Sequence, residues 1–176
     1  SRFRFRGRDA LFFVVIMLML LPFQVTMVPN VITLRAMGLL DTIWAIILPM
    51  TVAPFYIFLL RQYMVGLPGD MIEAAQIDGA GTLRCFIHVV LPVCQPILGA
   101  AVALSFADCW NLVEQPLTYL TTHTELYPLS VVFNQLTQQS TGVEFAGAAL
   151  YTLPALLIYL YFQNDILEGV QLTELK

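Results

Sequence analysis

The sequence predicts an all-α membrane protein, a polytopic helical bundle with four membrane helices in residues 1–176. Composition is the first reason: 59% of the residues are hydrophobic and 11% are charged, with a mean hydropathy of +0.78, whereas soluble domains carry about a quarter charged residues. The second reason is that the hydrophobic residues form long charge-free stretches, each close to the about 20 residues that a helix needs to cross a bilayer. These stretches are 10–29, 42–60, 86–107 and 145–164.

Basic residues predict the orientation of the bundle. With the amino end inside the cell, seven of the eight basic residues lie on the inner side and only Arg35 lies outside, as the positive-inside rule requires. Both ends of this chain and the polar interval 67–86 are then cytoplasmic, and 110–144 is an outer segment. Trp44 and Trp110 fall at the outer ends of their helices, where indole rings favour the headgroup layer. The inner basic residues are Arg2, Arg4, Arg6, Arg8, Arg61, Arg84 and Lys176.

Two further patterns modify this outline. Six prolines, at positions 22, 49, 54, 92, 96 and 154, lie within or beside the spans, and we expect kinks there whose freed carbonyls neighbouring helices satisfy. In the outer segment, an i, i+3, i+4, i+7 pattern follows Pro128 and predicts an amphipathic helix lying on the bundle or near the outer interface. Its apolar residues are Leu129, Val132, Phe133 and Leu136.

The chain offers no pattern typical of an enzyme. His88 and His123 are expected on opposite sides of the membrane, and no phosphate-binding GxxxxGK[ST] loop is present. Three cysteines, at positions 85, 94 and 109, lack metal-ligand spacing and are expected as small buried residues at different depths of one helix. The net charge of −4 argues against nucleic acid as a partner. We expect no catalytic residue, no metal and no cofactor in this chain.

The polar interval 67–86 predicts two short helices joined by a hinge. Leu67-Pro68-Gly69 should end the preceding helix. Asp70 is expected to cap a helix over about 71–78, with Glu73 completing a capping box. Gly79 suits a position that needs positive φ, and Thr82 is expected to cap the second helix.

This interval resembles the cytoplasmic signature loop of bacterial ABC importer permeases. The matching pattern is Glu-Ala-Ala at 73–75, Asp-Gly-Ala at 78–80, Phe86 and Leu91-Pro92. The resemblance implies that Glu73, Ala74 and Ala75 face a cleft of a separate ATPase subunit, that Asp78 and Gly79 shape the turn, and that Ala80 keeps it compact. Two alternatives remain open here, that Glu73 only caps its helix and that Gly79 serves only the turn.

Two weaker matches narrow the resemblance to carbohydrate importers of the maltose and glycerol-3-phosphate type. They are the Arg-Phe-Arg-Phe-Arg-Gly-Arg run at 2–8 and Trp110-Asn111. The resemblance covers residues 1–176 as one permease domain and implies six helices in the full subunit, two of them upstream of this chain. It also implies a bacterial inner membrane location and, as partners, a second permease, an ATPase dimer that binds the ATP, and an extracytoplasmic solute-binding protein. The segment 165–176 departs from the Gly-rich basic tail of these permeases.

Asp108 and Asn111, near the outer mouth, are the candidates for lining the solute pathway, because sugars need hydrogen-bond partners. The same class of importer with another solute is the first alternative. An ion-coupled carrier or a channel is the second, although no acid or base lies mid-span except His88, near one end. A membrane enzyme is the weakest alternative, because no acid–base or metal cluster is present.

Overall fold

The computed structural model describes residues 5–136 and 141–174, so the expectations for Arg2, Arg4 and Lys176 lie outside it. Every regular element among the described residues is helical, which confirms the predicted fold class. The elements are α1 (Arg8–Met19), α2 (Phe23–Ala36), α3 (Trp44–Thr51), α4 (Pro54–Gly66), α5 (Asp70–Ile77), α6 (Thr82–Cys85), the π-helical turn η1 (Phe86–Val90), α7 (Leu91–Val93), α8 (Gln95–Trp110), α9 (Glu114–Tyr119), the 3-10 turn η2 (Thr124–Leu126), α10 (Leu129–Leu136) and α11 (Thr141–Glu174).

Within the described ranges, two helical segments are long and apolar enough to cross a membrane unbroken, and two bent pairs bring the number to four. The unbroken ones are Trp44–Gly66 and Glu144–Gly169. The kink expected at Pro22 is present: α1 and α2 meet at 103° beside it, so the charge-free stretch 10–29 does not form one continuous helix. The span expected over 86–107 is also bent, by 67° between α7 and α8. Proline removes a backbone donor and clashes with the preceding turn, and prolines flank both breaks.

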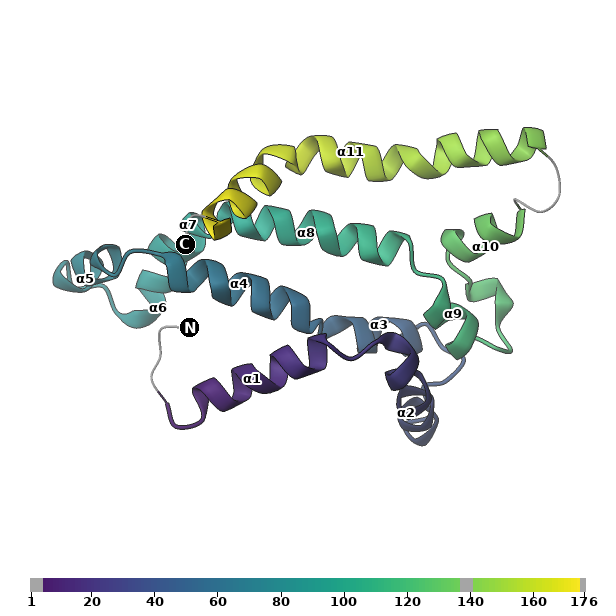
Figure 1. Cartoon of the computed structure of the whole chain (residues 1–176), viewed down its shortest axis with the longest axis horizontal. Coiled ribbons are helices and arrows are strands. Elements are labelled where there is room, and N and C mark those ends of the chain that lie inside the picture. The colour runs from purple at the N-terminus through teal and green to yellow at the C-terminus, as the bar shows by residue number, and fades with distance from the viewer. Residues whose placement is uncertain (1–4, 137–140, 175–176) are drawn as a thin grey trace.

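The helices α1, α4, α8 and α11 run between two ends of the bundle, whereas α2 lies at one of them (Figure 1). At one end, here called the α5 end, lie α5, α6, the start of α1 and the last turns of α11. At the other, the α10 end, lie α2, α9, α10 and the start of α11. The α5 end therefore carries Arg8, Arg61 and Arg84, whereas Arg35 lies on α2 at the α10 end.

Small residues let α8 and α11 pack closely. The buried face of α8 consists of Ile97, Gly99, Ala100, Ala101 and Ala103. A Cβ added to Gly99 would lie 2.7 Å from the Cβ and Cγ of Asp165 on α11, so only glycine fits at this crossing. Small residues are the usual means by which membrane helices approach, since apolar burial gives little driving force in lipid.

At the α10 end, reciprocal hydrogen bonds join α8 to α11. The Trp110 Nε1–H donates to the Tyr151 carbonyl at 3.1 Å, and the Tyr151 hydroxyl donates to the Trp110 carbonyl at 2.6 Å. Phe133 of α10 stacks on Tyr151 with ring centroids 5.2 Å apart. The predicted helix after Pro128 is therefore present and packs on the bundle, as expected.

The buried face of α10 differs from the prediction. Ser130 and Val131 are buried, and the Ser130 hydroxyl donates to the Leu112 carbonyl at 2.5 Å. Leu129 and Val132, which the pattern placed on the packing face, are exposed. The contact with residue 112 rotates the helix away from the face that the apolar spacing favours. The side chain of Leu136, the fourth member of the pattern, lies outside those that the structure describes.

Candidate functional site

The elbow formed by α5, α6 and the turn between them extends from the bundle at the α5 end (Figure 1). The expected helix over about 71–78 is present as α5, but neither α5 nor α6 has a side-chain cap hydrogen bond. Asp70 and Thr82 are the first residues of their helices, not the caps; Gly69 and Gly81 hold those positions. The expected capping box is therefore absent. The Gly69 carbonyl accepts from the Ile72 and Glu73 amides instead, so the helix starts one residue earlier.

The turn at the end of α5 has the geometry that the sequence predicts. Gly79 has φ +80°, its amide donates to the Gln76 carbonyl at 3.0 Å, and the Ala80 amide donates to the Ala75 carbonyl at 2.9 Å. This pair of bonds is a Schellman motif, in which the C′ residue takes a left-handed conformation. A Cβ on Gly79 would meet no atom within 4 Å, so backbone conformation alone requires glycine within this chain.

Exposure divides the elbow into an inner and an outer face. Ile72 and Ala75 are half-buried, and Cys85 is buried. Glu73, Ala74, Asp78 and Gly79 are exposed, and Ala80 is half-buried. Of the three residues expected to face a partner, Glu73 and Ala74 are exposed and Ala75 is half-buried.

Two apolar residues that sequence reasoning missed dominate the outer face. Ile77 is 86% exposed and Leu83 is 72% exposed. The signal was present: on a helix, Ile77 lies about 140° from Ile72 at 100° per residue, so both cannot face the bundle. Exposed apolar surface is a candidate protein-binding surface where it forms a contiguous patch outside the bilayer.

A cavity of about 510 Å³ separates the elbow from the bundle. Glu73 and Gln76 line it from α5, and Met64 and Leu67 line it from the end of α4. The elbow therefore rests on the bundle through few side chains. Its remaining lining residues are Gly69, Ile72, Thr82, Cys85, Phe86 and Val90.

Asp108, in the last turn of α8, and Asn111, the residue that follows α8, contact different helices. The Tyr56 hydroxyl of α4 donates to the Asp108 Oδ2 at 2.5 Å. The Asn111 amide donates to the Ala107 carbonyl at 2.8 Å, and its Oδ1 accepts from the Tyr151 hydroxyl at 3.3 Å. Both side chains are exposed, but Asn111 is engaged through both of its polar atoms, whereas Asp108 keeps one carboxylate oxygen for another donor.

Asp41, between α2 and α3, connects two loops at the α10 end. It is a non-glycine residue with positive φ, at +62°. Its carboxylate accepts the Thr122 amide at 2.7 Å and the Thr121 hydroxyl at 3.3 Å, and its own amide donates to the Tyr119 carbonyl at 3.0 Å. The Thr122 amide lowers the pKa of Asp41 below its usual value, because it stabilises the charged form.

The cysteines lie on separate elements and not on one helix as expected. Cys85 ends α6, Cys94 lies at the bend before α8, and Cys109 lies on α8. Cys85 and Cys94 are buried, but Cys109 is exposed. Within residues 5–136 and 141–174, no group of three or more His, Cys, Asp or Glu side chains is arranged to hold a metal ion.

Comparisons with known proteins agree on one family. The family model described as "Binding-protein-dependent transport system inner membrane component" matches residues 1–165. The chain is 29% identical over 98% of its length to the arabinooligosaccharides transport system permease protein AraQ of Bacillus subtilis, of which it covers 62%. It is 32% identical over 97% of its length to the diacetylchitobiose uptake system permease protein NgcG of Streptomyces coelicolor, of which it covers 58%.

A solved structure supports the same assignment. A chain of a bacterial ABC transporter involved in the import of the acidic polysaccharide alginate matches with a TM-score of 0.75 at 26% identity, over 93% of this chain and 64% of that one. The present chain thus spans less than two thirds of the length of these relatives. The chain belongs to the family of binding-protein-dependent transport system inner membrane components.

Proposed function

We propose that this chain is part of the permease subunit of an ATP-driven importer for a sugar or sugar-like solute. In the assembled transporter it pairs with a second permease, receives solute from an extracytoplasmic binding protein and contacts an ATPase dimer that binds the ATP. The family match supports the transport role, and the relatives named for arabinooligosaccharides and diacetylchitobiose support a carbohydrate solute. A same-family importer for a non-sugar solute is the alternative; the ligand of the co-purified binding protein distinguishes the two.

The exposed outer face of the elbow carries the proposal of ATPase docking. Ile77 and Leu83 are strongly exposed, whereas Glu73, one helical turn before Ile77, has no capping role and lines the cavity between the elbow and the bundle. We assign Ile77 and Leu83 to an apolar pocket of the ATPase, with Ala74 and Asp78 at its rim and Glu73 at the edge of the cavity, where it remains exposed to the partner. Ala75, Gly79 and Ala80 hold the shape of the elbow. The basic residues at the α5 end support a cytoplasmic location for this surface and for both ends of the chain.

Cysteine cross-linking in the assembled transporter tests the docking surface. With the exposed Cys109 replaced by serine, Ile77→Cys should cross-link to a cysteine on the ATPase, and the yield should change when ATP is added. Thr124→Cys, exposed in η2 at the α10 end, is the matched control and should give no cross-link. Equal yields at both positions, or none at Ile77→Cys while the ATPase co-purifies, would contradict the proposal.

Asp108 is the stronger of the two candidates for contact with solute. Its side chain is exposed, and the Tyr56 hydroxyl of α4 bonds only one of its two carboxylate oxygens. Asp108→Asn keeps an acceptor for the Tyr56 hydroxyl but removes the charge, and it should raise the solute concentration needed for half-maximal uptake. Asn111→Ala should act mainly on stability, since the Asn111 side chain is bonded within the chain. Unchanged uptake by Asp108→Asn with impaired uptake by Asn111→Ala would reverse this assignment.

A further inference from the structure

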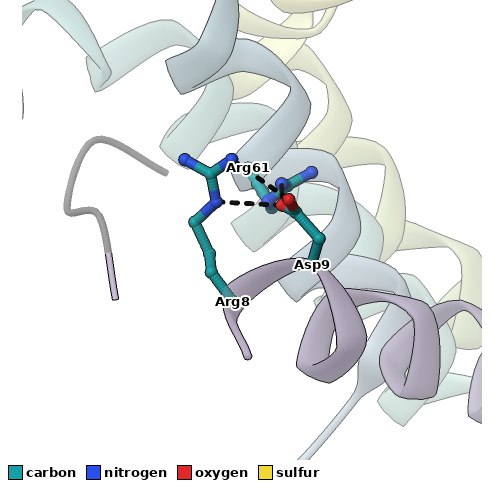
Figure 2. A network of polar contacts seen from close by, with 3 residues as sticks. All are labelled: Arg8, Asp9 and Arg61. Carbon is teal, nitrogen blue, oxygen red and sulfur yellow. Dashed lines mark hydrogen bonds and ion pairs between the residues drawn. The ribbon is translucent and has the colours of Figure 1, made fainter. Parts of the chain in front are cut away.

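Two arginines share one carboxylate where α1 starts beside the last turns of α4. The Arg8 Nε–H donates to the Asp9 Oδ1 at 2.9 Å and its Nη2 donates to the Asp9 Oδ2 at 3.4 Å. The Arg61 Nη2 lies 3.6 Å from the same Asp9 Oδ1 (Figure 2). The cluster therefore carries one more positive than negative charge. Arg6, two residues earlier in the chain, is exposed and adds another cation.

The Arg61 guanidinium is held in a largely apolar setting. Its Cζ lies 3.5 Å from the centroid of the Phe12 ring, which stacks on Phe58 at 5.9 Å. Only 21% of the Arg61 side chain is exposed, whereas Asp9 is 77% exposed. An arginine buried to this degree normally has its donors matched by anions. Among the described residues, Asp9 is the carboxylate that contacts Arg61, at the loose distance of 3.6 Å, so donors of both guanidinium groups remain available for a second anion.

The surroundings favour a lipid over a free ion as the source of that anion. A hollow of about 530 Å³ adjoins Arg8 and Asp9, lined also by Phe5, Gly7 and Ala10. Directly after it, Leu11, Val14 and Leu18 form an exposed apolar stripe along α1. A phospholipid matches both parts, because its phosphate pairs with guanidinium groups and its acyl chains cover an apolar helix face.

We propose that Arg8 and Arg61 bind the phosphate of an anionic phospholipid from the leaflet at the α5 end, with its acyl chains along α1. Asp9 orients the two guanidinium groups and limits the binding strength, because its carboxylate repels the phosphate. This arrangement predicts that changes at Asp9 and at the arginines affect lipid binding in opposite directions, which a purely structural ion pair would not. Removing the Asp9 charge should strengthen lipid binding, whereas removing the arginines should weaken it.

Lipid retention by the purified, assembled transporter provides the test. The complex is taken from bilayers of phosphatidylglycerol and phosphatidylcholine, and the ratio of the two lipids that remain bound is measured by native mass spectrometry. Each arginine near an anionic headgroup should contribute roughly fivefold, so Arg8→Gln should lower the phosphatidylglycerol ratio roughly fivefold. The double variant with Arg61→Gln should lower it by roughly twentyfold or more.

Matched variants separate a lipid site from general charge effects and from unfolding. Arg35→Gln makes the same charge change at the α10 end and should leave the ratio unchanged. Asp9→Asn should raise the ratio, and Arg8→Lys with Arg61→Lys should retain part of it. The proposal is overturned if Arg35→Gln acts like Arg8→Gln, if Asp9→Asn fails to raise the ratio, or if inorganic phosphate displaces the lipid. It also fails if the second permease covers α1 and the arginine variants change nothing.

Discussion

Replacing Gly99 by alanine should separate α8 from α11 at their tightest crossing. The added Cβ would lie 2.7 Å from both the Cβ and the Cγ of Asp165. Rotating the Asp165 side chain moves the Cγ but not the Cβ, so the helices themselves must shift. Overpacking of this kind costs about 1–3 kcal/mol, and alanine regains about 1 kcal/mol of helix propensity over glycine. With the overpacking cost near its upper end, we expect the free energy of unfolding to fall by about 2 kcal/mol.

Gly169→Ala is the matched control on the partner helix. Its Cβ would lie 3.4 Å from the Cβ of Ala100, an ordinary van der Waals distance, so this variant should be neutral or slightly more stable. A thiol-reactive dye measures unfolding, because Cys94 is fully buried beside Ile97 and becomes reactive only when the bundle opens; Cys109→Ser removes the exposed thiol. The apparent Tm of Gly99→Ala should fall by about 4–8 °C. Equal Tm values for the two variants would refute close packing at Gly99.

The remaining predictions concern the elbow and the outer loops. Gly79→Ala should lower the free energy of unfolding by about 1–2 kcal/mol, because alanine is strained at a positive φ. The added Cβ meets no atom within 4 Å, so this strain is the whole effect; thermal unfolding measures it. Gly81→Ala is the matched control, because its added Cβ meets no atom within 4 Å and its φ is negative; its Tm should be unchanged, and a loss equal to that of Gly79→Ala would contradict the role of the positive φ. The lowered pKa of Asp41 means that its contribution to stability is present above the usual aspartate pKa and is lost as the pH falls through the folded value. The Tm difference between the wild type and Asp41→Ala should therefore shrink in acid, and a difference that stays constant or grows would contradict this linkage.

Local backbone conformation was predictable where only one residue type adopts the required dihedral angles easily. Gly79 is an example, because a left-handed helix end strongly favours glycine and the observed φ agrees. The caps were less predictable, since Asp70 and Thr82 are good capping residues that the chain uses as the first helical residues instead. The adjacent glycines, Gly69 and Gly81, take the cap positions, and water can satisfy the free amides at an exposed elbow.

Prolines show why span boundaries were predicted better than span shape. Pro22 lies at a break of 103°, whereas Pro154 lies inside the continuous helix α11 and Pro49 inside α3. The same residue therefore breaks or merely interrupts the hydrogen bonding, depending on whether neighbouring helices hold the chain straight. That information is tertiary, so the apolar stretches indicated how many spans exist but not which of them bend.

Contacts between distant residues were beyond a single sequence. Tyr56 and Asp108 are 52 positions apart, and no local pattern links a tyrosine on one helix to an aspartate on another. The pairing of Asp9 with Arg61 is a second example. The count of basic residues placed Arg61 on the inner side of the membrane but did not indicate its partner. Sequence reasoning located the candidate residues but could not establish which of them share a site.

The reciprocal bonds between Trp110 and Tyr151 restrict how the two longest packed helices can move. Sliding α11 along α8 by one residue, about 1.5 Å, would stretch both bonds together. Pivoting about the midpoint between the two residues would strain neither bond. A change in the angle between these helices should therefore be a rotation about the Trp110–Tyr151 contact. The largest displacement should occur at the opposite ends of the two helices, near the elbow.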